Sequence, residues 1–438
     1  MAKTPGLKDV PARDIERSLL ANGVRVWSER IPRASRCAVG VWIDAGSRYE
    51  ELKESGATYL LQRLSMRGTR NRTADQIADA IDALGGKFDY DTERDYACWR
   101  ALVDGSGMES ALDLLADLAL RPQIGSAAKS AEQASLLEEL RDAEKEADLN
   151  LDRMFLRSLW KGHGLCRPPR GRLLTVKGKA RLEDFKPKAL SRFHERTHHP
   201  LALTITAAGA VNHEKFRETA GRLFGSLGEP KKTASTRPPT PYRFFALRSR
   251  PQFSGVRMQL GFPACQASDR QRHAAALLNS VIAGGAGSRL TRLFRNKGLA
   301  AADVSSSLLQ FADAGVLSIR LRTSAKQAGE ALDAVVGELR RLTLEAVDDQ
   351  ELRRAKATAK AGVLTRIDTP MARIEDLARQ ERYFGGPMDW PGEFAALAAV
   401  TANDLRRLAS EWIGPHNLSL AVLGNLKGVM IRPKVLEW

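Results

Sequence analysis

A segment near the N-terminus, SGATYLLQRLSMRGT (residues 55–69), places three polar side chains at helical spacing. Tyr59, Gln62 and Arg63 stand at positions i, i+3 and i+4, which share one face of an α-helix. Filled with two histidines and a glutamate, this spacing binds zinc and activates its bound water. A protonated phenol is a poor zinc ligand, an amide cannot accept a proton, and a guanidinium offers no lone pair. The segment therefore predicts a helix without zinc chemistry.

The rest of this helix predicts how it is held. At about 100° per residue, Ala57, Leu60, Leu61 and Leu64 form one apolar face. We expect that face to pack on the protein interior. The three polar residues then point the opposite way, where a substrate cavity would lie.

Cysteine usage and net charge exclude several other classes. Four cysteines lie far apart without a CxxC pair, which fits neither a zinc knuckle nor a disulfide scaffold, and predicts free thiols in a reducing compartment: Cys37, Cys98, Cys166 and Cys265. The net charge is +16. The basic residues are spread along the chain without an RRM, KH or zinc-finger signature, so an acidic protein partner or peptide is favoured over nucleic acid.

Length and composition predict a globular protein of more than one domain. The chain has 438 residues, 43% of them hydrophobic, which is too long for a single core. No apolar run approaches the roughly 20 residues of a membrane span, and the N-terminus lacks the apolar region of a secretory signal. We therefore expect a soluble, cytoplasmic protein that does not contact a membrane.

The chain divides into two halves with the same order of elements. A segment rich in Pro, Lys, Ser and Thr near the middle indicates a linker. In each half a strand pattern is followed by several helices, and each half closes with a helix and a strand. This order predicts an α+β fold of two related domains, 15–227 and 244–430, joined by a linker at 228–243. Each domain should be a mostly antiparallel or mixed sheet with helices packed on one face.

Six stretches in the same order resemble the M16 metallopeptidases, a family that includes pitrilysin, insulysin and the mitochondrial processing peptidases. The first-half stretches include residues 22–50, 55–69 and 73–103. The others include GHGLCRPPRGRLLTVKG and, in the second half, NSVIAGGAGSRLTRLFRNKGLA. The resemblance covers nearly the whole chain and implies two M16-type domains.

Active members of that family carry HxxEH on the first-domain helix and a glutamate ligand about 80 residues later. By this resemblance Tyr59 and Arg63 stand at the two histidine positions and Gln62 at the catalytic glutamate. Glu139 stands at the retained third-ligand position, and Glu132 lies seven residues before it. The resemblance thus implies a vestigial zinc site with no catalytic residue, no metal and no cofactor.

Two roles remain open for Arg63. It could replace the metal as the counter-charge of Glu139, which would avoid an unpaired, partly buried carboxylate. Alternatively, it could face solvent. The first hypothesis predicts that the two side chains form an ion pair.

The second half and the histidines offer two further candidate sites. Arg289 matches an arginine that holds the substrate backbone in active relatives, whereas the tyrosine used beside it is replaced by Ala301. Arg289 could therefore bind peptide or only brace its loop. His194 and His198 have i, i+4 spacing, but no acidic residue lies between them in the base position. The resemblance places them at a surface helix end, away from the cavity.

These features imply a catalytically inactive subunit that pairs with an active M16 peptidase subunit as a heterodimer. Non-catalytic subunits of mitochondrial processing peptidases and bacterial two-chain enzymes are family precedents. One of these trims the precursor peptide of pyrroloquinoline quinone, which makes that pathway a candidate. The alternatives are a scaffold subunit, like the M16-derived core proteins of a respiratory complex, and a peptidase with an unusual site.

Overall fold

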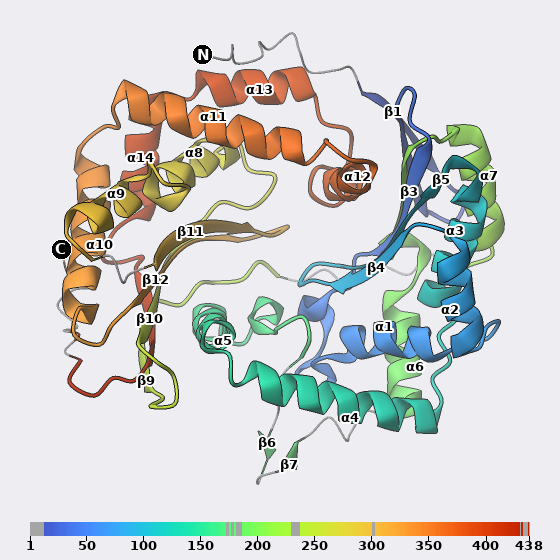
Figure 1. Ribbon diagram of the computed structural model, residues 1–438. Helices are drawn as coiled ribbons and strands as arrows, with labels where there is room; N and C mark the ends of the chain where they lie inside the picture. The colour runs from blue at the N-terminus through green and yellow to red at the C-terminus, as the bar shows by residue number, and fades with distance from the viewer. Residues whose placement is uncertain are drawn as a thin grey trace.

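The computed structural model describes residues 13–171, 175–176, 179–180, 186–228, 237–299, 303–429, 431 and 437. Ala301 and residues 229–236 of the predicted linker lie outside this part. The described chain forms two sheet-and-helix halves, with the first half at the right of Figure 1 and the second half at the left.

The first half contains a six-stranded mixed sheet. Its strands lie in the order β1 (Asp14–Leu19), β2 (Arg25–Arg30), β8 (Leu203–Gly209), β3 (Arg36–Ile43), β5 (Ala97–Asp104) and β4 (Lys87–Thr92). β2 and β8 are parallel, and the other neighbours are antiparallel. The central strands β3 and β8 are buried on both faces, which explains their nearly continuous apolar sequence.

The described residues of this half also form seven longer helices: α1 (Ala57–Arg67), α2 (Ala74–Ala83), α3 (Met108–Leu120), α4 (Ser126–Ala143), α5 (Ala147–Leu159), α6 (Pro187–Thr197) and α7 (His213–Phe224). α3 and α7 cover one face of the sheet, where Leu112, Leu115 and Phe216 join the strand side chains in one core. A short hairpin is formed by β6 (Thr175–Val176) and β7 (Lys179–Ala180).

The second half repeats this arrangement with five strands. They lie in the order β11 (Asp303–Gln310), β12 (Gly315–Thr323), β10 (Val256–Ala264), β13 (Ser419–Gly424) and β9 (Phe245–Ser249). Its helices are α8 (Arg272–Ala283), α9 (Arg289–Asn296), α10 (Ala328–Leu344), α11 (Asp349–Thr365), α12 (Pro370–Phe384), α13 (Trp390–Ala399) and α14 (Ala402–Trp412). α8, α10 and α14 supply the core on one face of this sheet.

The two sheets share one strand order, which confirms the repeat predicted from the sequence. In each half, the strand that ends the half (β8 or β13) lies between the first long strand (β3 or β10) and a parallel neighbour (β2 or β9). The first half differs by its additional edge strand β1. The fold is therefore two related α+β units, as the sequence predicted.

Each sheet also receives a helix from the other half. α12 packs Ile374 and Ala378 on Ala38 and Trp42 of the first sheet, and α5 packs Phe155 against Ala421 and Leu423 of the second. Both helices lie between the two sheets (Figure 1). The sequence predicted helices on one face only. The crossing helices add a layer on the opposite face because the central strands are apolar on both sides.

Buried charges accompany this exchange. Glu29 on β2 accepts from Arg13 at 2.5 Å, and Arg13 also contacts Asp376 of α12 at 2.7 Å. Trp27 Nε1 donates to Glu381 Oε2 of α12 at 2.8 Å. These pairs satisfy charges that would be costly to bury alone, and they tie α12 to the first sheet. No helix in the described ranges is both long and apolar enough to cross a membrane.

Candidate functional site

Helix α1 is fixed by its apolar face. Ala57, Leu60, Leu61 and Leu64 are each at most 2% exposed, as the sequence predicted. They share a core cluster with side chains of two neighbouring helices, Leu136 and Leu140 of α4 and Leu190 and Phe193 of α6. α4 therefore runs beside α1, and its polar residues can reach those of α1.

The start of α1 is set by a buried carboxylate. Glu50 accepts hydrogen bonds from the backbone N–H of Gly56 at 2.8 Å and of Thr58 at 2.9 Å, so it satisfies donors that the first helical turn leaves free. Burial raises the pKa of Glu50 to about 8, against the opposing effect of these N–H groups. Gly56 has φ of +96°, and a Cβ there would lie 3.3 Å from Gly171 Cα, which is why glycine is needed at this turn.

Arg63 is held by three side chains of α4. Its Nε lies 2.6 Å from Glu132 Oε2, its Nη1 contacts Glu139 Oε1, and its Nη2 lies 2.9 Å from Ser135 Oγ. The predicted ion pair between Arg63 and Glu139 is therefore present. Burial opposes the charge, but the hydrogen bonds that the guanidinium donates to Glu139 and Glu132 outweigh it and raise the pKa of Arg63. The guanidinium is a fixed cation between two carboxylates.

Tyr59 covers the open side of this cluster. Its hydroxyl is 3.3 Å from Glu139 Oε2, and the guanidinium carbons of Arg63 and Arg170 lie 5.7 and 5.8 Å from its ring centroid. Burial, and next the charge of Glu139, raise the pKa of Tyr59, so the phenol stays protonated and donates to the carboxylate. The Glu139 side chain is 40% exposed. It is thus the one carboxylate of this cluster that solvent reaches readily, since Glu132 is only 3% exposed.

Gln62 does not face a cavity, contrary to the sequence prediction. It is fully buried, and its Nε2 donates to the carbonyl oxygens of Asp91 at 3.0 Å and Cys98 at 2.9 Å. Thr92 Oγ1 donates to its Oε1. The amide therefore bonds the edge strand β4 and its neighbour β5 to α1, because it can both donate and accept. A general base at this position would need access to water, which Gln62 lacks.

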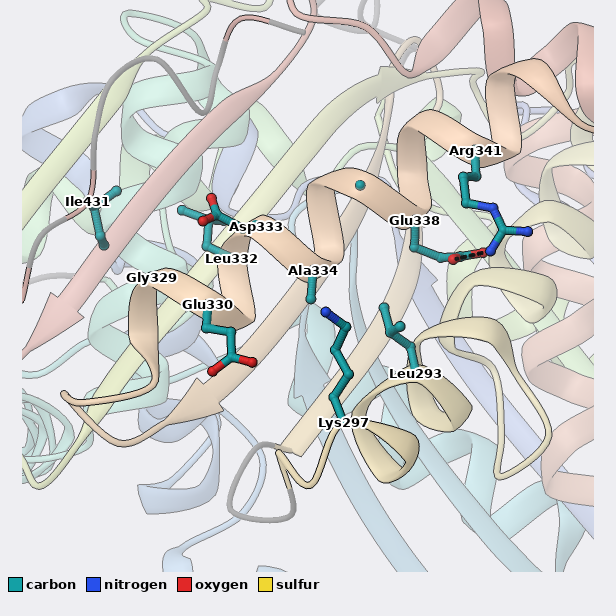
Figure 2. A pocket seen from close by; sticks show the side chains of 11 residues that line it. Leu293, Lys297, Gly329, Glu330, Leu332, Asp333, Ala334, Glu338, Arg341 and Ile431 are labelled. Atoms are coloured by element: carbon teal, nitrogen blue, oxygen red, sulfur yellow. Dashed lines mark hydrogen bonds and ion pairs between the residues drawn. The ribbon is translucent and has the colours of Figure 1, made fainter.

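Arg289 is also enclosed by carboxylates. It is 10% exposed, and its Nη2 lies 2.7 Å from Glu351 Oε2 and its Nη1 3.3 Å from Glu338 Oε1. Figure 2 shows Glu338 on α10, beside the groove between α9 and α10, pointing toward Arg341. That groove encloses about 690 Å³. The sequence left open whether Arg289 binds peptide or braces its loop. These contacts match the bracing role.

The histidine pair lies at the C-terminal end of α6, as the sequence predicted, but His198 is buried and His194 half-buried, so the predicted surface location is wrong for His198. His198 is 8% exposed, and its ring stacks on that of His194 with centroids 4.0 Å apart. His194 Nε2 donates to the carbonyl oxygen of Ala119 at 2.9 Å. Burial lowers the pKa of both rings, that of His198 more strongly. The pair fills space between α6, α3 and Trp99 of β5.

The chain belongs to peptidase family M16. The family model described as insulinase (peptidase family M16) matches residues 25–171, and the model described as the peptidase M16 inactive domain matches residues 184–359. An uncharacterized zinc protease of Streptomyces coelicolor is 28% identical over 420 residues, which cover 94% of this chain and 90% of that protein.

Two further comparisons extend this family assignment. The probable mitochondrial-processing peptidase subunit beta of Arabidopsis thaliana is 26% identical and covers 93% of this chain, which spans 78% of that protein. The crystal structure of a protease from Helicobacter pylori superposes with a TM-score of 0.84 at 20% identity, over 94% of this chain and all of that one. The latter shows the shared fold.

The donor set around α1 does not fit the zinc ion that this family implies. Among the described residues, no three His, Cys, Asp or Glu side chains form a group that could hold a metal. More directly, Arg63 lies between Glu132 and Glu139, where its charge would repel a dication. Tyr59 is a donor, and Gln62 is bonded to backbone carbonyls. This arrangement can order α1 against α4 and present Glu139 and Tyr59 to a ligand.

Sequence reasoning missed three members of the cluster. Ser135 lies three residues after Glu132 and so shares its face of α4, and Arg67 lies one turn after Arg63 and also contacts Glu132. That spacing could have identified both residues. Arg170 reaches Tyr59 from a distant loop, and no local pattern marks it.

Proposed function

We propose that the chain is a catalytically inactive M16 subunit, which pairs with an active zinc M16 subunit, completes the peptide-binding chamber and supports peptide processing. One observation carries the proposal. The guanidinium of Arg63 lies between the two carboxylates of α4, at the position that resemblance assigns to a zinc ligand. A permanent cation there neutralises the acidic pair and keeps α1 packed on α4.

In this proposal Tyr59, Gln62, Arg63, Glu132 and Glu139 are the remains of a zinc site that now stabilise the domain. Gln62 holds the sheet edge, and Arg63 holds α4. The exposed carboxylate of Glu139 and the ring of Tyr59 remain for contact with a peptide or with the partner. Arg289 braces α9 rather than gripping a substrate, since its guanidinium is taken by Glu351 and Glu338.

The proposed partner is an active M16 chain. The Arabidopsis relative is described by its name as one subunit of a processing peptidase, which is consistent with assembly from unlike chains. The net charge of +16 would steer an acidic partner or peptide toward this chain. We propose a cytoplasmic complex, with the precursor peptide of pyrroloquinoline quinone as one substrate to assay.

The test combines the purified chain with an M16 protein that retains HxxEH and is encoded beside it. We expect a 1:1 complex by light scattering after size exclusion, zinc only in the partner by mass spectrometry, and peptide cleavage faster than by the partner alone. Cleavage by this chain alone, abolished by a chelator, would overturn the inactive assignment. A stable self-assembly that ignores the active partner would favour the scaffold alternative.

A further inference from the structure

A second polar cavity lies in the second half, away from the Arg63 cluster. It encloses about 330 Å³ and is lined by α8, α11, α13 and the end of α12. Part of its wall is apolar, with Val363, Phe394 and Leu397 among the lining side chains. The remainder carries charge, which distinguishes it from an ordinary packing void.

The charged part of the wall is mainly cationic. Arg272, Arg366 and Arg379 line the cavity together with one glutamate, Glu393. Arg272 already contacts Glu393 through Nη2, and His273 Nε2 lies 3.5 Å from the other oxygen of that carboxylate. Glu393 is thus already paired with residues of α8. It is therefore not the counter-charge of Arg366 or Arg379.

Arg366 and Arg379 share one nearby carboxylate, that of Asp376. Asp376 Oδ1 lies 4.0 Å from Arg366 Nε and 3.7 Å from Arg379 Nε, beyond hydrogen-bonding distance. The other oxygen of Asp376 accepts from Arg13 Nη1 at 2.7 Å and from Gln380 Nε2 at 2.5 Å. Positive charge is therefore in excess at the wall.

Several buried donors at the same wall lack an acceptor. Trp390 is 4% exposed, and within the described part of the chain its Nε1 has no hydrogen-bond partner, nor do Arg272 Nε and Arg379 Nε. Buried N–H groups are nearly always hydrogen bonded in folded proteins. An unpaired indole N–H beside surplus arginines indicates an acceptor that carries negative charge.

We propose that this cavity binds a carboxylate with an apolar body, either a small organic acid or the terminus of a peptide. The carboxylate accepts from the indole N–H of Trp390 and balances Arg366 and Arg379. The apolar body packs on Val363, Phe394 and Leu397. A carboxylate is favoured over phosphate for two reasons. Glu393 in the same wall would repel a dianion, and inorganic phosphate has no apolar body that could pack on the apolar lining. The proposal does not depend on the inactivity of the Arg63 cluster.

The test measures binding of 4-phenylbutyrate to the full chain by calorimetry and by thermal shift, with its uncharged amide and inorganic phosphate as matched probes. We expect the acid to bind and to raise the melting temperature, and the amide and phosphate to bind at least about tenfold more weakly. Equal binding of the amide, tighter binding of phosphate, or no binding of the acid would each overturn the proposal. An acetylated dipeptide ending in phenylalanine, with a free carboxylate or as its amide, distinguishes the peptide source from the small acid.

Variants assign the binding to these side chains. Trp390→Phe removes the N–H and keeps an aromatic ring, and Arg366→Gln removes one charge from a side chain that is 43% exposed. Each should weaken 4-phenylbutyrate binding at least about fivefold, whereas Arg366→Lys should restore most of it. Arg407→Gln, on an exposed face of α14, is the matched control and should bind as the parent does. Unchanged binding in both Trp390→Phe and Arg366→Gln would reject the site, and Arg366→Gln keeps the test valid if the tryptophan variant fails to fold.

Discussion

The two halves each contain an arginine held between two glutamates. In the first half Arg63 lies between Glu132 and Glu139, and in the second Arg289 lies between Glu338 and Glu351. The second cluster is closed, with all three side chains at most 10% exposed. In the first cluster Glu139 is 40% exposed, and Tyr59 covers it.

The difference indicates what each cluster does. We propose that the closed arginine serves as a brace, because each of its three nitrogens already donates to a carboxylate. The first cluster has the same pairing, which explains how an arginine can replace a metal without leaving buried carboxylates unpaired. Its open carboxylate and aromatic ring are the features that the second cluster lacks, and in the proposed function they are the part of the cluster that contacts a peptide or a partner.

The largest expected effect comes from placing a glutamate beside Arg63. Gln62→Glu puts a carboxylate against the carbonyl oxygens of Asp91 and Cys98, with which the amide now bonds. We expect the free energy of unfolding to fall by about 4 kcal/mol at pH 7, the order seen for a buried charge without a partner. Urea unfolding measures it. An unchanged free energy of unfolding would show that this face of α1 is open to water, as in an active site. It would contradict the interpretation of both clusters as structural.

The second prediction concerns the closed cluster. Arg289→Ala leaves Glu338 and Glu351 buried, although Arg292 still contacts Glu351 at 2.6 Å. We expect the free energy of unfolding to fall by about 3 kcal/mol, which is less than the cost of leaving a buried carboxylate with no partner. The matched variant Arg289→Lys should recover only part of this stability, because an ammonium group cannot reproduce the planar set of donors of the guanidinium. If Arg289→Ala were fully stable yet lost peptide binding, Arg289 would be a ligand contact and not a brace.

Much of the fold could be predicted from the sequence because its signals are local or periodic. The repeat of strand and helix patterns gave the two related units, and the apolar spacing of Leu60, Leu61 and Leu64 gave the buried face of α1. The crossing helices α5 and α12 could not be predicted in the same way. Their apolar faces are visible in the sequence, but nothing local specifies that Phe155 packs on the second sheet and Ile374 on the first.

The candidate site was predictable in part for the same reason. Helical spacing and the family resemblance placed Arg63 opposite Glu139, and the ion pair is present. Gln62 was expected on the open face because a helical projection ignores the neighbouring sheet, whose strands β4 and β5 cover it. The histidines were expected at the surface because a helix end usually is. His198 is instead buried against Trp99 and His194.

The third prediction tests the open cluster directly. Arg63→Ala removes the cation between Glu132 and Glu139, but Arg67 still contacts Glu132, and solvent reaches Glu139. We therefore expect a smaller loss than for Arg289, about 2 kcal/mol. Arg217→Ala, which breaks a surface ion pair with Glu214, is the control and should leave the free energy of unfolding unchanged. An Arg63→Ala variant as stable as this control would remove Arg63 from any structural role.

The fourth prediction uses acid, which should loosen the first half before the second. The folded protein holds the pKa of His198 well below 6.5, so the unfolded chain takes up more protons as the pH falls through that value. Stability is then full above about pH 6.5 and declines below it, by about 1 kcal/mol at pH 6 for this residue. Hydrogen exchange of α6 should accelerate relative to α14, its counterpart in the repeat. In His198→Asn the decline should be shallower, and an unchanged slope would contradict the assignment.

The smallest effect separates contact from support within the open cluster. Tyr59→Phe removes a hydroxyl that lies 3.3 Å from Glu139 and retains the ring beside Arg63 and Arg170. We expect a loss of about 0.5 kcal/mol, because the bond is long and part-exposed, and the cation–π contacts survive. Complex formation with the active partner, measured by light scattering and titration, should weaken more in Tyr59→Ala than in Tyr59→Phe. If Tyr59→Phe cost as much stability as Arg63→Ala, Tyr59 would belong to the brace, and the contrast with the closed cluster of Arg289 would disappear.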